Sequence, residues 1–171
     1  MRLILTDRAL RVAVPDDGKT AYVDLTTRKI ARCVGCFGCW TRTPGRYVIR
    51  DDATRIYPLI ARSDTLLYVS RIRYGGYDTV MKTMLERAIP VQQAFIRVVD
   101  GETHHEQRAV VPKRATIVAY GAETPDELEL FRQLIARNAR NMNFTEHRVL
   151  FVREDEVDDT VKQLIATWER S

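Results

Sequence analysis

The stretch Thr65-Leu66-Leu67-Tyr68-Val69 decides the fold, and a polar loop from Ser70 to Gly76 follows it directly. The run shows no alternation of polar and apolar residues, which is typical of a strand in a parallel sheet with helices on both faces. Residues 115–120 repeat this pattern, and residues 147–152 supply a further strand. We therefore expect an α/β protein with a mostly parallel sheet.

The other elements are placed outward from this stretch. Strands are expected at residues 3–5 and 20–25. Helical spacing of apolar residues predicts helices that open near Asp51-Asp52, near Asp78, near Thr124 and near Val157. The order of elements predicts a three-layer α/β/α sandwich with five strands, in a single domain over residues 1–171.

The connection between the first two strands is unusual. It contains the turn signal Pro15-Asp16-Asp17-Gly18, and the rest is short and β-branched at Val12 and Val14. A crossover helix does not suit such a segment. We expect the first crossover helix of the fold to be missing.

Composition excludes several classes of protein. The chain has 171 residues, 45% hydrophobic and 29% charged, with a net charge of +4. Its basic residues are scattered and form no stripe with aromatic residues, so we expect no nucleic-acid partner. The first residues lack the apolar run of a signal peptide, and no stretch approaches the length of a membrane span, so we expect a cytoplasmic protein without a membrane partner.

Parallel sheets of this kind bind ligands beyond the carboxyl ends of their strands, where the strand order reverses. Three loops should meet there: the segment after the first strand, residues 70–77, and residues 120–124. A cysteine turn at residues 31–46 follows the second strand, and we expect it beside the same crevice. A long excursion without clear periodicity, residues 91–112, is the other segment of note.

The cysteine turn reads Cys33-Val34-Gly35-Cys36-Phe37-Gly38-Cys39-Trp40. Three cysteines are an odd number, which does not suit a disulfide framework. One interpretation is structural, with small sulfurs filling a tight turn. A second is a redox dithiol, because two-residue spacing permits a disulfide. A third is a zinc site that combines the three thiolates with His104 or His105.

Several ordered motifs resemble the flavodoxin-like NAD(P)H-dependent FMN reductases, including their iron-sulfur flavoprotein branch. They are the cysteine turn, Thr43-Pro44-Gly45, Asp51-Asp52, Ser63-Asp64, Tyr74-Gly75-Gly76-Tyr77, and then Lys82 and Glu86-Arg87. The likeness covers about residues 20–140 and implies a flavodoxin-like fold. We interpret Lys82, Glu86 and Arg87 as solvated helix charges or interface groups.

The resemblance implies non-covalent FMN as the cofactor, with the loop after the third strand wrapped around the flavin ring. Glycines let the backbone approach a flat ligand, and Tyr74 or Tyr77 would stack on it. The cofactor-binding residues expected on this basis are Ser70, Arg71, Ile72, Arg73, Tyr74, Gly75, Gly76, Tyr77, Tyr120, Gly121, Thr6 and Arg8.

Two positions depart from the family pattern. The first loop of the family is a phosphate cradle that leads into a helix. Here the loop reads Thr6-Asp7-Arg8-Ala9, has no glycine, and contains an Asp7 carboxylate that opposes a phosphate. The residue after Ser70, commonly proline in the family, is Arg71.

A complete four-cysteine [4Fe–4S] cluster is not expected, because Tyr47 stands where related chains carry the fourth cysteine and no further cysteine exists. The stretch Gly101-Glu102-Thr103-His104-His105 is either a polar surface loop or, as the resemblance implies, a lid over the crevice or a dimer contact. His104 and His105 are the candidate catalytic residues, as proton relays.

The leading hypothesis is an oxidoreductase that passes electrons from NAD(P)H through FMN to a small acceptor. The resemblance also implies a homodimer or tetramer. One alternative is a cofactor-free flavodoxin-like binding or assembly module. The other is a thiol- or metal-dependent redox sensor that uses Cys33, Cys36 and Cys39.

Overall fold

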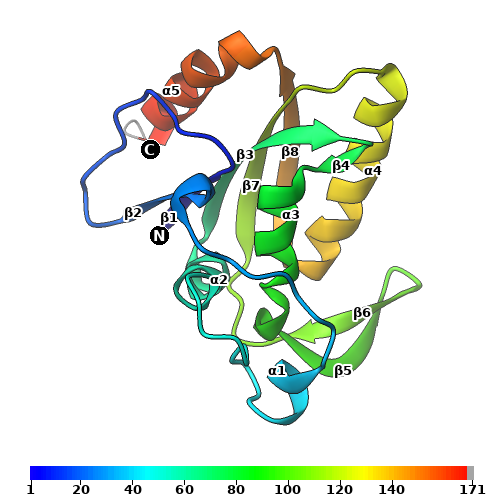
Figure 1. Ribbon diagram of the computed structural model, residues 1–171. Coiled ribbons are helices and arrows are strands. Elements are labelled where there is room, and N and C mark those ends of the chain that lie inside the picture. The colour runs from blue at the N-terminus through cyan, green and yellow to red at the C-terminus, as the bar shows by residue number, and fades with distance from the viewer. Residues whose placement is uncertain (169–171) are drawn as a thin grey trace.

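Five parallel strands form the centre of the computed structural model, which describes residues 1–168. They stand in the order β2-β1-β3-β7-β8 (Figure 1). Their bounds are β1 Arg2–Thr6, β2 Thr20–Asp24, β3 Thr65–Arg73, β7 Lys113–Tyr120 and β8 Phe144–Val152. The short strand β4 (Gly76–Tyr77) pairs antiparallel with the end of β3. The mostly parallel α/β sheet predicted from the sequence is confirmed.

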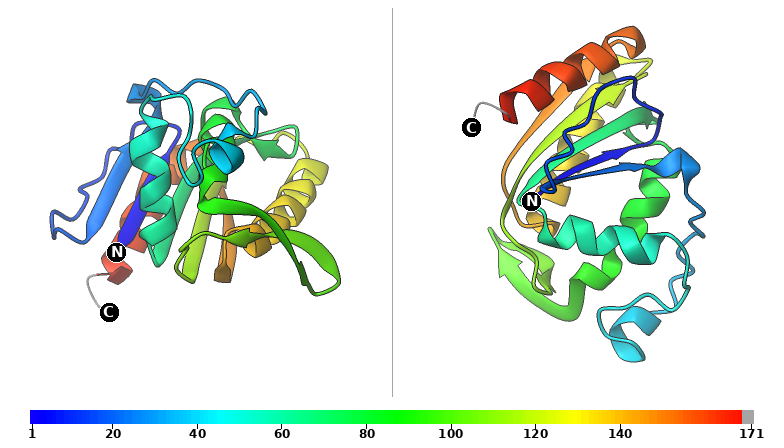
Figure 2. Two further views of the ribbon diagram at one scale, coloured as in Figure 1. Left: turned by 90° about the horizontal axis from the view of Figure 1, so that it is seen from below. Right: turned by 90° about the vertical axis from the view of Figure 1, so that its left-hand side faces the viewer.

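Helices cover both faces of this sheet, as the views in Figure 2 show. One face carries α2 (Ala53–Arg62), α3 (Thr79–Glu86) and α4 (Pro125–Asn141), and the other carries α5 (Val157–Trp168). Side chains of β3 alternate between the two cores: Leu66 and Tyr68 face the first, while Leu67 and Val69 face α5. Each fully buried aliphatic side chain contributes about 1.5–3 kcal/mol.

Residues 7–19 connect β1 and β2 without a helix, as expected. Leu10, Val12 and Val14 in this extended segment pack against the core under α5. The β-branched residues that disfavour a helix therefore supply the apolar cover that a crossover helix supplies elsewhere. The short 3-10 helix η1 (Leu25–Thr27) ends β2, and another, η3 (Glu154–Glu156), follows β8.

The excursion at residues 91–112 is a β-hairpin, not an irregular loop. The 3-10 helix η2 (Ile89–Val91) leads into β5 (Gln92–Val99), which pairs antiparallel with β6 (Glu102–Gln107). Asp100 and Gly101 form the turn with φ of 51° and 78°, as a two-residue hairpin turn requires. Asp-Gly is a hairpin signal that the sequence reading overlooked.

Helix starts follow the expected caps. Asp78 accepts a hydrogen bond from the N–H of Thr79, and Thr124 forms a capping box with Glu127. α2 differs, because Asp52 at its N-cap makes no capping bond and Asp51 accepts from the N–H of Ala53 instead. Within residues 1–168, no helix combines the length and apolar character needed to cross a bilayer.

Candidate functional site

The carboxyl ends of β1, β3 and β7 bring one carboxylate and three donors together. Oδ2 of Asp7 accepts hydrogen bonds from the Ser70 hydroxyl at 2.7 Å and the Arg71 backbone N–H at 2.9 Å. Oδ1 accepts from the Tyr120 hydroxyl at 3.0 Å. The strand register explains why these groups meet. It pairs Thr6, the residue before Asp7, with Val69, the residue before Ser70, and it pairs Arg71 with Tyr120.

The local backbone explains why Asp7 points into this edge. Its N–H donates to Val69 O at 3.1 Å, which extends the pairing of β1 with β3 by one residue. The Thr6 hydroxyl donates to Arg8 O and accepts from the Arg8 N–H, so the chain turns immediately after Asp7. The turn directs the carboxylate across the ends of the strands.

Burial raises the pKa of Asp7, against the opposing effect of its hydrogen bonds from Ser70, Arg71 and Tyr120. Burial also raises the pKa of Tyr120, and the nearby Asp7 carboxylate acts in the same direction. The Tyr120 hydroxyl is therefore a neutral donor at physiological pH.

Two arginines flank the ring of Tyr120. The guanidinium carbon of Arg8 lies 5.4 Å from the ring centre and that of Arg71 lies 5.6 Å away. Both reach Glu154: Nη2 of Arg71 is 2.7 Å from Oε2 of Glu154, and Nη1 of Arg8 donates to Glu154 O at 3.2 Å. We call Asp7, Arg8, Ser70, Arg71, Tyr120 and Glu154 the carboxyl-edge cluster. The sequence reading missed Glu154, although it follows the fifth strand at the same edge.

The loop after β3 is a tight turn. Tyr74 and Gly75 have φ of 52° and 71°, and Arg73 pairs with Gly76. A Cβ on Gly75 would lie 2.7 Å from Cβ of Leu130, so the close approach of this turn to α4 requires glycine. A groove of about 590 Å³ between α3 and α4 begins at this turn.

The residues expected to contact a flavin ring divide into two groups. Ile72 and Tyr77 belong to the core, where the Tyr77 ring packs edge-on against Phe131 with centroids 5.0 Å apart. Tyr74 is 86% exposed at the tip of the turn. Arg73, Tyr74 and Gly76 line the groove. Gly121 has a φ of 77° and packs under the Arg71 side chain, which ties it to the cluster.

The structure corrects the position of the cysteine turn. Its helix α1 (Gly38–Thr41) lies at the opposite end of the sheet, beside the hairpin (Figure 1). Nε1 of Trp40 donates to Gln92 O at 3.1 Å, and the Trp40 ring lies 4.5 Å from that of His105. The turn is carried there because residues 28–37 run along the molecule from the end of β2 without regular structure.

Arg87 holds this segment in place, which corrects its interpretation as a solvated charge or interface group. Its side chain is fully buried, and its guanidinium donates to both carboxylate oxygens of Asp51. It also donates to Ala31 O and Ile49 O, and it lies 3.8 Å from the centre of the Tyr47 ring. One arginine at the end of α3 thus joins the segment that enters the cysteine turn to the segment that leaves it.

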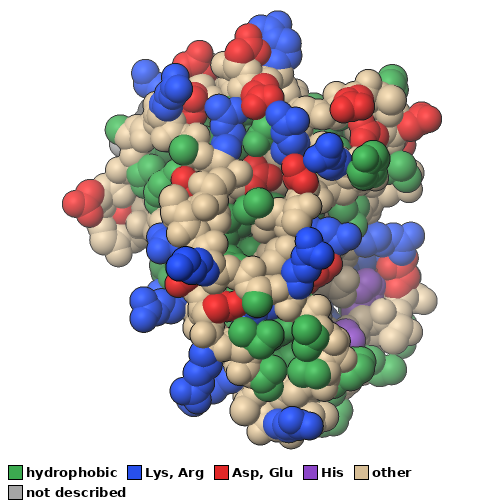
Figure 3. Space-filling view, in the orientation of Figure 1, with side chains coloured by type: hydrophobic (Ala, Val, Ile, Leu, Met, Phe, Trp, Pro, Cys, Tyr) green, Lys and Arg blue, Asp and Glu red, His purple; other side chains and the backbone are tan. Residues whose placement is uncertain are grey.

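The three cysteines are free thiols of unequal exposure: Cys33 is half-buried, Cys36 exposed and Cys39 buried. With Tyr47 they line a small cavity of about 40 Å³. Burial raises the pKa of Cys39. In the part of the chain that the structure describes, no three Cys, His, Asp or Glu side chains are grouped so as to hold a metal ion. Hydrophobic side chains gather over α1 in Figure 3. Val34 and Phe37 of the cysteine turn are exposed.

The candidate catalytic histidines also lie away from the carboxyl edge. Nδ1 of His104 is 2.9 Å from Oδ1 of Asn141, and Nε2 is 3.2 Å from Oε2 of Glu102. Asn141 is the last residue of α4, which begins at the carboxyl edge and has 17 residues, about 25 Å of helix. Within one chain the hairpin therefore does not cover the carboxyl-edge cluster. The hairpin begins after α3 has run from the carboxyl edge to the opposite end of the sheet.

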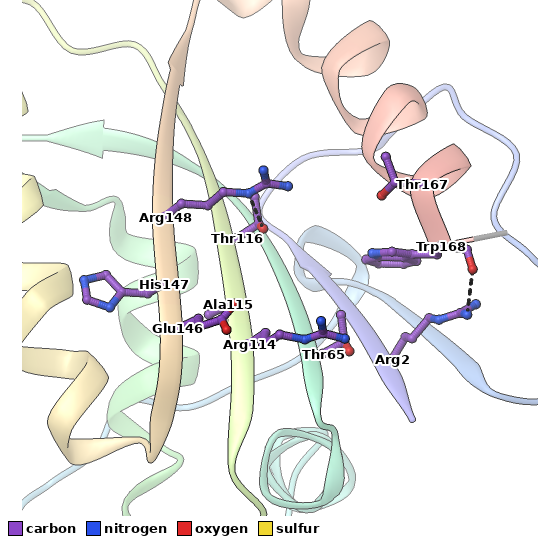
Figure 4. A pocket seen from close by; sticks show the side chains of 10 residues that line it. All are labelled: Arg2, Thr65, Arg114, Ala115, Thr116, Glu146, His147, Arg148, Thr167 and Trp168. Carbon is purple, nitrogen blue, oxygen red and sulfur yellow. Dashed lines mark hydrogen bonds between the residues drawn. The ribbon is translucent and has the colours of Figure 1, made fainter. Parts of the chain in front are cut away.

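A further pocket of about 340 Å³ opens on the α5 face near the amino ends of the strands (Figure 4). Arg148 on β8 donates to Thr116 on β7, and Arg2 donates to Trp168 O, so two of its arginines already have partners. No residue predicted from the sequence to bind a ligand lines this pocket.

The strand order, with helices on both faces and a polar cluster at the carboxyl edge, defines a flavodoxin-like α/β protein. No family model matches the chain. It is 24% identical over 92 residues to an iron-sulfur flavoprotein of Methanocaldococcus jannaschii, a match that covers 54% of this chain and 47% of the relative. It is 29% identical over 86 residues to an iron-sulfur flavoprotein of Archaeoglobus fulgidus, covering 50% and 38%. The matches thus span less than half of each relative.

Among solved structures, the chain is similar to an FMN-dependent NADH-azoreductase from Bacillus anthracis that was determined in complex with FMN. The TM-score is 0.58 with 8% sequence identity, over 98% of this chain and 96% of that one. This likeness establishes the shared fold over the described chain. The sequence resemblance to iron-sulfur flavoproteins is confirmed, and the likeness to the FMN-dependent reductases holds for the fold.

Proposed function

We propose that this chain is a flavoprotein oxidoreductase that binds FMN non-covalently at its carboxyl edge and passes electrons from NAD(P)H to a small acceptor. The flavodoxin-like fold and the similarity to proteins named as iron-sulfur flavoproteins and FMN-dependent reductases support this function.

The convergence of donors at the carboxyl edge carries the proposal. The hydroxyls of Ser70 and Tyr120 and the N–H of Arg71 point at one anionic group between three strands. Arg8 and Arg71 add two guanidinium groups beside them. Neutral donors backed by arginines form the kind of site that binds a phosphate. These donors are of the type that holds the phosphate of FMN, and in this chain the Asp7 carboxylate occupies them.

The turn after β3 supplies the surface for the flavin ring. Gly75 and Gly76 keep side chains off the turn, and Tyr74 is exposed for stacking. Residues 70–77, with Tyr120, Gly121, Thr6 and Arg8, thus form the proposed cofactor site. Ile72 supports the turn from the core side, and Tyr77, which packs against Phe131, also lines the groove.

Bound FMN would supply hydride transfer, and the chain would hold and shield the ring. The carboxyl-edge cluster contains no free acid or base, because Asp7 and Glu154 are each engaged by their neighbours. His104 and His105 belong to the hairpin at the other end, so any proton relay through them requires a second chain. We propose a homodimer or tetramer in the cytoplasm, in which the exposed Phe95, Ile96 and Val98 of β5 are covered.

One observation favours a second candidate, a cofactor-free binding or assembly module. The Asp7 carboxylate already satisfies all three donors of the carboxyl edge, and no helix N-terminus follows β1. A chain that has replaced its cofactor anion by its own carboxylate would keep the fold without the flavin.

The visible spectrum of the purified full chain separates the two candidates. We expect flavin absorption bands, or saturable quenching of FMN fluorescence when FMN is added. The absence of both would contradict the flavoprotein function and leave the cofactor-free module. Anaerobic addition of NADH or NADPH to the FMN-bound chain then tests reduction of the flavin.

A further inference from the structure

We infer that Asp7 is a specificity-determining residue of the carboxyl edge: its carboxylate competes with the phosphate of FMN, so the chain binds riboflavin at least as tightly as FMN. This inference rests on the proposed flavin site. It assigns Asp7 a role in choosing between two forms of the same ring system, one with a phosphate monoester and one without.

The competition follows from the number of hydrogens available. The Ser70 hydroxyl, the Tyr120 hydroxyl and the Arg71 backbone N–H each have one hydrogen to donate. Asp7 accepts from all three, at 2.7, 3.0 and 2.9 Å, and among the described residues the Ser70 hydroxyl has only one other acceptor within reach, Arg71 O at the longer distance of 3.2 Å. A phosphate oxygen at this position would need the same hydrogens. The phosphate therefore binds only where the carboxylate is displaced or loses its charge.

The backbone prevents easy displacement. The N–H of Asp7 is bonded to Val69 O, and the Thr6–Arg8 turn fixes the chain on either side. The Asp7 side chain can leave the strand ends only by breaking its hydrogen bonds to Ser70, Arg71 and Tyr120, so its charged carboxylate would lose all three donors.

The surrounding charges do not offset the repulsion. Arg8 and Arg71 both contact Glu154, so the two cations face two carboxylates, Asp7 and Glu154. The nearby Asp78 adds a further negative charge that acts on Asp7. Within the six-residue carboxyl-edge cluster two positive charges meet two negative ones, so a phosphate dianion finds no net positive charge there, whereas a neutral residue at position 7 would leave that cluster one excess positive charge.

Riboflavin escapes this competition because it has the ring and the ribityl chain but no phosphate. Its ring would use the turn at residues 73–76, which does not depend on the anion position. The ratio of the dissociation constants of FMN and riboflavin thus reports on the phosphate position, and its change on substitution of Asp7 reports on Asp7, while the absolute values report on the ring site.

The test measures both dissociation constants by flavin fluorescence quenching, in the full chain and in two variants. Asp7→Asn removes the charge and keeps the size of the side chain. Asp16→Asn removes one charge from an exposed position in the turn before β2 and is the matched control. We expect Asp7→Asn to lower the FMN to riboflavin ratio about tenfold or more and Asp16→Asn to leave it unchanged.

A second measurement uses inorganic phosphate as the probe and needs no flavin. Phosphate should raise the melting temperature of Asp7→Asn, or of Asp7→Ser if the first variant folds poorly, and should leave the unmodified chain and Asp16→Asn unchanged. If no flavin binds any form but phosphate stabilises Asp7→Asn, the proposed function fails and the role of Asp7 stands. An unchanged ratio together with no phosphate effect overturns the role of Asp7. A smaller dissociation constant for FMN than for riboflavin in the unmodified chain overturns it without any variant.

Discussion

Arg87 and Asp51 form a two-point ion pair, with Nη1 2.7 Å from Oδ2 and Nη2 2.8 Å from Oδ1. The arginine is fully buried, and the carboxylate is 15% exposed. The pair ties the end of α3 to the chain that enters α2, and the other hydrogen bonds of Arg87 hold both arms of the cysteine turn. This single side chain anchors the segment that differs most from its predicted position.

Replacing Arg87 by methionine should lower the free energy of unfolding by about 3–5 kcal/mol, because the Asp51 carboxylate and two backbone carbonyls lose their partner. Chemical denaturation measures the change. Arg55→Met, on the exposed side of α2, is the control and should cost less than about 0.5 kcal/mol. Equal effects of the two substitutions would show that the buried pair does not hold the turn.

The buried ammonium of Lys113 should make the free energy of unfolding rise with pH. Its ammonium is buried and donates to Ala61 O and Val111 O, and burial lowers its pKa from 10.5 to about 8. Between these two pH values the unfolded chain binds more protons than the folded chain, so stability increases as pH rises, by up to about 3 kcal/mol. Lys113→Met should remove this part of the pH dependence, and Lys162→Met, exposed on α5, should retain it. The same slope in all three forms would contradict the assignment.

The thiols should react in the order of their exposure. Cys36 is exposed and should be alkylated first, whereas burial and a raised pKa protect Cys39. Mass spectrometry after timed exposure to iodoacetamide gives the rate for each residue. Modification of Cys39 as fast as Cys36 in the folded chain would mean that the turn does not pack as described.

Gly75→Ala should destabilise the chain more than Gly18→Ala. Both glycines have positive φ, so both substitutions carry backbone strain of about 1 kcal/mol. Only the new Cβ at position 75 meets another atom, Cβ of Leu130 at 2.7 Å, while the space around Gly18 is open. Thermal unfolding of both variants separates strain from contact. The contact argument fails if the two substitutions shift the melting temperature equally.

Sequence patterns predicted the sheet because each strand carries its own signal. The run at Thr65–Val69 is buried on both faces, and the caps at Asp78 and Thr124 form as expected. The missing first helix also followed from local residues, Val12 and Val14. Such features depend on residues close together in the sequence, so they can be predicted before the fold is known.

The site was predicted only in part, because its key contacts join distant segments. Ser70, Arg71 and Tyr120 were placed at one edge by topology, but their shared bond to Asp7 spans 63 to 113 residues of sequence. Arg87 reads as an ordinary helix charge until Asp51 is placed beside it. The cysteine turn was misplaced for the same reason, since no local pattern shows that Trp40 packs on His105.

The most direct test of the central claim is anaerobic reduction of FMN by NADH or NADPH in the presence of the purified chain, followed at the flavin absorption bands. We predict saturable FMN binding and bleaching faster than that of free FMN at the same nicotinamide concentration. Bleaching no faster than that of free FMN, together with no quenching on titration, would contradict a flavin-dependent oxidoreductase.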